Sequence, residues 1–178
     1  MQSIIPGHRP VPIRRTSIGA VLIWTASLAA NPAAAATLPS EQVLTLALAQ
    51  EAVAAALQAC EDQGYRVSVA VVDRSGRIKA QLRGDGAGPH TLDSSRKKAY
   101  TALSLRHATS DLVALIQKRP EAAGLKEMNA EILILGGGLP IAAGEEVIGG
   151  IGVGGAPGGH LDESCAKAGI DKIRNRLR

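Results

Sequence analysis

The chain has 178 residues, a formal net charge of +4 and an aromatic content of 2%, with one Trp, two Tyr and no Phe. Proteins that stack bases or sugars on flat side chains need more aromatic rings, so binding of single-stranded nucleic acid and lectin-like sugar binding are disfavoured. The two cysteines form no C-x-x-C motif and no paired Cys/His spacing of the kind that holds structural zinc.

Residues 1–36 have the composition of a secretory signal peptide. A basic start that ends in the pair Arg14-Arg15 precedes an uncharged, mostly apolar run over 18–30, and small residues follow it. The run is shorter than the roughly 20 residues of a membrane-spanning helix. We expect cleavage after Ala36, at the end of an A-x-A motif, and a secreted or periplasmic protein with no membrane segment after cleavage. The arginine pair leaves twin-arginine export open beside the general secretory route.

Residues 37–178 are enough for one domain, and they are close to neutral because the signal segment carries arginines and no acid. The first expected element is a long helix from Leu38 to Gln63, with Ser40 as its N-cap and Gly64 at its C-terminal stop. Mostly apolar residues at 3–4 spacing predict its buried stripe. These are Val43, Leu46, Ala47, Gln50, Val53, Ala54 and Leu57.

A β-hairpin is expected next, because alternating valines in YRVSVAVVD and the segment IKAQLR flank a turn from Asp73 to Gly76. Two helices should follow, over about 91–106 and 110–118, the second ended by Pro120. Glu131–Leu135 is interpreted as a short buried strand, followed by a second strand in EVIGGIGVGG.

Glycines inside that second strand indicate a bulge or the close approach of another backbone. A terminal helix over 161–177 completes the order helix, hairpin, helices, strands, helix. Short connections make the strands antiparallel. The expected fold class is therefore α+β, an antiparallel sheet covered by helices, in a single domain after the signal peptide.

Two glycine motifs point to different chemistry. Gly150, Gly152 and Gly155 fit G-x-G-x-x-G by letter, but they lie within a predicted strand instead of a strand-to-helix loop, so dinucleotide binding is disfavoured. The run GGG at 136–138 allows its backbone N–H groups to converge on an anion, with a flexible turn as the alternative. The pair Asp162-Glu163 is interpreted as helix-start residues and not as catalytic carboxylates.

Three histidines remain after the signal segment, and His90 is the most informative. It lies between a Gly/Pro-rich loop and a helix of small residues, which leave room for a flat ligand or another subunit. Neutral imidazole is a good iron ligand, so His90 is either a metal ligand or a residue that caps the helix or lines a subunit interface. His107 is explained by its helix end, and His160 by a solvated loop.

Cys60 and Cys165 are the only cysteines. In an oxidising compartment a disulfide between them is favoured, and two free buried thiols are the alternative.

The segments VSVAVVDRSGRIKAQLRGDGAGPHTLDSSRKKAYTAL and GGGLPIAAGEEVIGGIGVGGAPGGHLDESCAKAG resemble the GlcG/HbpS-like family of haem-binding proteins, which is related to the C-terminal domain of the PduO corrinoid proteins. The resemblance covers about 44–173. It implies a profilin-like fold, homo-oligomers and, in some members, binding of haem or a related tetrapyrrole. No catalytic residue of the family carries over to this chain.

The favoured function is therefore an exported, non-catalytic protein that binds haem or a similar tetrapyrrole, for sensing or storage. The alternatives are an enzyme or accessory factor acting on a small organic acid, and a structural oligomer. His90 is the expected axial ligand, with His160 as the next candidate. The other expected cofactor-binding residues are Arg83 and Arg96, which would pair with propionates, and Thr91, Gly137 and Gly138.

Overall fold

A computed structural model describes residue 38 and residues 40–178; the expected signal peptide lies outside the described residues. A hairpin of β1 (Ser68–Asp73) and β2 (Ile78–Arg83) forms one side of the sheet, with β2 at its edge, as the alternating pattern predicted for the hairpin. Its turn is stabilised by Asp73, whose Oδ1 accepts bonds from the Ser75 hydroxyl at 2.6 Å and the Ser75 N–H at 2.9 Å.

Two more strands, β3 (Gly138–Ala143) and β4 (Glu146–Gly154), complete a four-stranded sheet in the order β2-β1-β4-β3. Every neighbouring pair is antiparallel. The expected strand at 131–135 is wrong: this segment is irregular, and the strand starts at Gly138. The N–H of Leu133 donates to the Thr101 hydroxyl of α2 at 2.8 Å. This N–H is therefore bonded to a helix side chain and not to a neighbouring strand.

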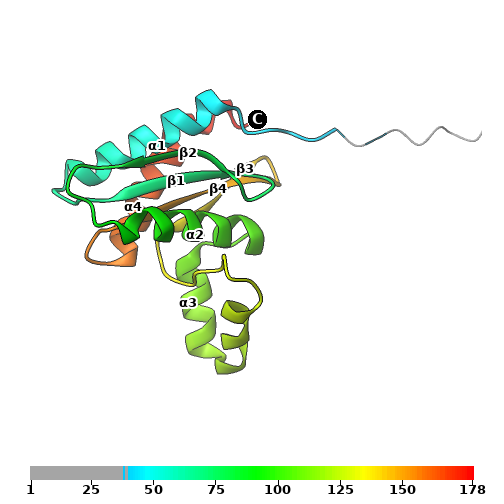
Figure 1. The fold of residues 1–178 in the computed structure, drawn as a ribbon. Helices are drawn as coiled ribbons and strands as arrows, with labels where there is room; N and C mark the ends of the chain where they lie inside the picture. Colours follow the sequence, from blue (N-terminus) through cyan, green and yellow to red (C-terminus); the bar gives the residue numbers. More distant parts are fainter. Residues whose placement is uncertain (1–37, 39) are drawn as a thin grey trace, which may run out of the picture. The chain divides into compact units, whose positions relative to one another are not determined.

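Helices cover both faces of the sheet (Figure 1). On one face α1 (Leu46–Glu61) and α4 (Gly159–Ile173) pack on the larger apolar core, and on the other face lies α2 (His90–Leu105). The chain continues from α2 into α3 (Thr109–Lys118) and the 3₁₀ helix η1 (Pro120–Glu127), which extend away from the sheet. A short 3₁₀ turn, η2 (Arg174–Arg176), ends the last helix earlier than expected.

The first helix differs from its prediction in start and in phase. It begins at Leu46 with Thr45 as N-cap, whose hydroxyl accepts from the Leu48 N–H, so the expected start near Ser40 is wrong. Leu46 is 52% exposed. The buried stripe is made mainly of small residues: Ala49, Ala52, Val53, Ala56 and Cys60. Of the predicted stripe only Val53 is fully buried, because α4 approaches α1 too closely for larger side chains.

The glycines of β4 let α2 lie directly on the sheet. A Cβ added to Gly150 would come within 2.2 Å of the Ala99 carbonyl oxygen, and one on Gly152 within 2.1 Å of the Ser95 carbonyl oxygen. Contacts this short are impossible, so the expectation of a close backbone approach is confirmed. These residues belong to an antiparallel strand, which is not the setting of a dinucleotide-binding loop.

Candidate functional site

The N-terminal end of α2 carries His90 as its first residue. The residue is exposed, and among residues 40–178 the imidazole forms no hydrogen bond or ion pair. Its ring lies against Gly88, where an added Cβ would come within 2.7 Å of the ring carbon Cε1. Gly88 therefore leaves room for the ring beside the start of the helix, and the imidazole nitrogens stay open to an external partner.

The loop at 84–89, which leads into His90, is tied down at two points. Arg83 donates from Nε to the Ala87 carbonyl at 2.8 Å, and its Nη2 reaches the same oxygen. The Thr91 hydroxyl donates to the Gly88 carbonyl at 2.6 Å and lies 2.7 Å from the Ser68 hydroxyl. Thr91 is buried, so its side chain anchors the loop to β1.

Arg96 lies farther along α2 and is held by two carboxylates. It forms an ion pair with Asp93 at 2.8 Å and another with Glu131 in the segment after η1. The hydrogen bond from Arg96 is the main reason why the pKa of Asp93 lies below its ordinary value. Arg96 thus connects α2 to the irregular segment at 131–135.

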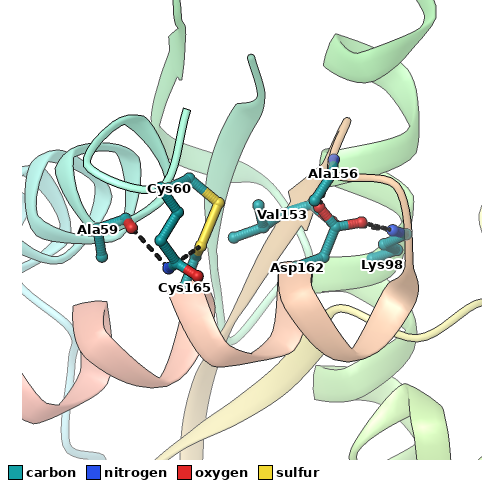
Figure 2. The surroundings of a disulfide bond; sticks show 8 residues. Ala59, Cys60, Lys98, Val153, Ala156, Asp162 and Cys165 are labelled. Carbon is teal, nitrogen blue, oxygen red and sulfur yellow. Dashed lines mark hydrogen bonds and ion pairs between the residues drawn. A yellow bond between two sulfur atoms is a disulfide. The ribbon is translucent and has the colours of Figure 1, made fainter. Parts of the chain in front are cut away.

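A buried ion pair, Lys98 with Asp162, links α2 to the start of α4 (Figure 2). Lys98 Nζ donates to Asp162 Oδ2 at 2.7 Å and to the Val153 carbonyl at 3.0 Å. Asp162 Oδ1 accepts the Ala156 N–H at 3.0 Å. The side chains are 3% and 4% exposed. Burial raises the pKa of the Asp162 carboxyl, and the bond from Lys98 opposes that rise.

The glycine run at 136–138 packs around this pair. A Cβ on Gly137 would lie 2.6 Å from Asp162 Cβ, and one on Gly138 only 2.3 Å from the Lys98 carbonyl oxygen. The Gly138 N–H donates to the Thr109 hydroxyl at 2.8 Å. The N–H expected to help cradle an anion therefore has an internal acceptor, and the glycines lie beside Lys98, not beside His90.

The other histidines occupy separate positions. His160 is exposed near the start of α4, with its ring against Gly158 in the same way that His90 lies against Gly88. His107 is exposed just after α2. Within the described part of the chain, no three His, Cys, Asp or Glu side chains converge as a metal site.

A disulfide joins Cys60 of α1 to Cys165 of α4, as the sequence predicted, and no cysteine is left free (Figure 2). Both residues are fully buried. The Gln63 amide lies over the bridge, bonded to the Ala59 carbonyl at 2.8 Å and 4.0 Å from the Cys165 sulfur. The covalent link therefore fixes the two helices that cover one face of the sheet.

Sequence reasoning missed Lys98 and treated Asp162 as a helix-start residue. A signal was present: Thr91, Ser95, Ala99 and Ala102 define the buried face of α2, and Lys98 falls on it. A buried ammonium group requires a carboxylate or several acceptors. The helical spacing therefore implied a distant acidic partner, although it could not identify Asp162.

None of the helices in the described ranges is long and apolar enough to cross a membrane. The fold is shared with several solved structures. HbpS of Streptomyces reticuli, solved as a double mutant, is 46% identical, with a TM-score of 0.71 over 80% of this chain and 97% of that one. Protein ORFY of Klebsiella pneumoniae is 34% identical, with a TM-score of 0.71 over 78% and 97%. The PduOC:Heme complex, at 24% identity and a TM-score of 0.68 over 74% and 96%, shares the fold.

A curated relative, an uncharacterized 15.0 kDa protein in the dhaT-dhaS intergenic region of Citrobacter freundii, is 36% identical over 121 residues, which are 65% of this chain and 84% of that protein. The family model described as "Haem degrading protein HbpS-like" matches residues 44–171. The chain therefore belongs to the HbpS-like family.

Proposed function

We propose that this protein is an exported protein that binds haem or a related tetrapyrrole, with His90 as the axial ligand of the iron. The observation that carries the proposal is the exposed imidazole of His90, which has no partner among the described residues. It lies on a chain whose family is described by its action on haem. Imidazole nitrogen is a common axial ligand of haem iron.

The surroundings of His90 can contact one face of a porphyrin ring, but the arginines near it are already bonded and are not fully free to bind the propionates. Gly88 presents no side chain beside the His90 ring, and Leu92 on the first turn of α2 is 37% exposed. Arg83 and Arg96 already bond to Ala87, Asp93 and Glu131. A propionate would therefore have to replace one of these contacts or use a nitrogen such as Nη1 of Arg83.

Export is supported by the buried disulfide, because such bonds form and persist mainly in oxidising compartments. Self-association is part of the same proposal. Leu46 of α1 and Leu82 of β2 are 52% and 43% exposed, and they flank one groove that also contains Ala80. Apolar surface of this kind is available for contact with a second copy.

Titration of the purified protein with haemin tests the function. A saturable Soret band with a shifted maximum is expected at one haem per chain or per fixed number of chains. Haemin in buffer and haemin with serum albumin are the controls for free and non-specifically bound haem. Absence of a shifted band would contradict the proposal.

The same sample separates binding from degradation. The family description includes haem degradation, whereas a binding protein should leave the Soret band unchanged for hours. Adding ascorbate or peroxide and following the band shows which activity is present. Protein-dependent loss of the band, with release of iron to a chelator, would replace the non-catalytic proposal with an enzymatic one.

A further inference from the structure

A polar hollow lies at the opposite end of α2 from His90. It has a volume of about 240 Å³ and lies between the β1–β2 turn and the last turns of α2. Its polar lining includes Arg74, Ser75, Tyr100, Ser104 and Arg106. Since α2 has 16 residues, the hollow is roughly 20 Å from His90 along the helix. It is therefore separate from the proposed haem site.

Arg106 holds an unfavourable backbone conformation at this hollow. It is the C-cap of α2 with φ 57° and ψ 30°, and it is the only non-glycine residue with positive φ in the part of the chain that the structure describes. Glycine or asparagine is preferred at such a left-handed position. The arginine side chain forms no ion pair with any residue of 40–178. Arg106 thus lines the hollow with an exposed guanidinium that has no carboxylate partner in this part of the chain.

Arg74 supplies a second guanidinium from the hairpin turn. Its Nη2 donates to the Gln42 carbonyl at 3.1 Å and pairs with Glu146 at 2.8 Å. Its Nε is buried without an acceptor in the described structure. The neighbouring carboxylate, Asp73, uses Oδ1 for bonds within the turn from Ser75 and Arg77. Glu146 pairs with Arg74 alone, so the guanidinium of Arg106 is the one at the hollow that has no carboxylate partner among the described residues.

The lining residues define the chemical class of a ligand. Guanidinium groups bind carboxylate and phosphate oxygens through charge-assisted hydrogen bonds, and the hydroxyls of Ser104 and Tyr100 can donate to the same oxygens. The volume is below the roughly 300 Å³ at which pockets for drug-sized ligands begin, so a tetrapyrrole is too large. We propose that this hollow binds a small molecule through a carboxylate or phosphate group.

Calorimetry and thermal unfolding with malonate or inorganic phosphate as probes test the proposal, at an ionic strength held constant with NaCl. Saturable binding and a rise in Tm are expected for at least one probe, and the preferred probe identifies the oxyanion. Arg106→Gly should weaken that binding by about tenfold or more, because it removes one charge-assisted contact. The same substitution should raise the Tm of the ligand-free protein, because glycine relieves the left-handed backbone.

Arg119→Gly is the matched control, since it removes an exposed arginine at the end of α3, outside the hollow. It should leave the binding constant unchanged. A second test variant, Ser104→Leu, fills the hollow without changing its charge. This variant should abolish binding of the probe. Failure of both probes to bind saturably, or equal binding by the wild type and Arg106→Gly, would overturn the proposal. Haemin titration of the same variants should be unaffected, which separates this site from the proposed function.

Discussion

The ammonium group of Lys98 lies 2.7 Å from the carboxylate of Asp162, although the two residues are 64 positions apart and belong to helices packed on opposite faces of the sheet. The pair meets at the end of β4, where Val153 and Ala156 supply one backbone bond to each partner. The helix that carries His90 is therefore positioned by a contact with α4 as well as by the sheet.

Breaking this pair should be costly, because the remaining charge would be buried without its partner. Asp162→Asn and Lys98→Met should each lower the free energy of unfolding by about 3–5 kcal/mol, and the double variant should lose less than the sum. Urea unfolding measures all three. Lys97→Met is the control, since Lys97 pairs with Asp93 on the surface at 3.3 Å and should cost about 1 kcal/mol or less. Strict additivity would contradict the direct coupling.

Gly138 should not tolerate a side chain. Gly138→Ala would place Cβ 2.3 Å from the Lys98 carbonyl oxygen, so α2 would have to shift, at a cost of about 1–3 kcal/mol or more. Gly124→Ala in η1 is the matched substitution, because an added Cβ there meets nothing within 4 Å. Thermal unfolding should show a lower Tm for the first variant and an unchanged or higher Tm for the second. Equal Tm values would contradict the close packing of α2.

The sequence was sufficient for the hairpin, α2 and the antiparallel α+β arrangement, because alternating valines, turn residues and helix ends are local signals. It failed for α1, where hydrophobicity favoured Leu46 and the structure buries Ala49 and Ala52. The burial of these small residues depends on a glycine that is distant in the sequence. A Cβ on Gly169 of α4 would lie 2.5 Å from the Ala52 carbonyl oxygen. Such close packing of two helices cannot be deduced from the periodicity of one of them.

The positions of the candidate residues were predictable only where they are local in sequence. His90 and Arg83 lie at the two ends of the loop at 84–89, as the sequence indicated, and their roles toward haem stay predictions. Lys98 and Asp162 were not paired, because nothing local connects residues so far apart. Gly137 and Gly138 were assigned to a possible anion cradle, since sequence alone does not show which atoms face a glycine.

The disulfide should contribute strongly to stability. It closes a loop with a sequence separation of 105, so replacing both cysteines by alanine should lower the free energy of unfolding by about 2–5 kcal/mol. Urea unfolding with and without reductant tests this, and the double variant should not respond to reductant. Two thiols that react with a maleimide in non-reduced, unfolded protein would contradict the bridge.

Export should remove the N-terminal segment. Mass spectrometry of the periplasmic protein should show a chain that begins at or near Thr37, after the A-x-A motif. Replacing Arg14 and Arg15 by lysine should block export only if the twin-arginine route is used. A periplasmic protein that keeps Met1 would contradict cleavage, and retention of the whole chain in the cytoplasm would contradict export.

Haemin titration of His90→Ala tests directly whether His90 ligates haem iron. His160→Ala is the matched control, because both rings lie in the same way against a glycine at a helix start. Light scattering should first show that each variant keeps the oligomeric state of the wild type. His90→Ala is expected to lose the Soret shift and to bind haemin at least about tenfold more weakly, while His160→Ala should match the wild type. An unchanged spectrum and affinity in His90→Ala would contradict ligation by His90, and loss of the shift in His160→Ala alone would assign the iron to His160.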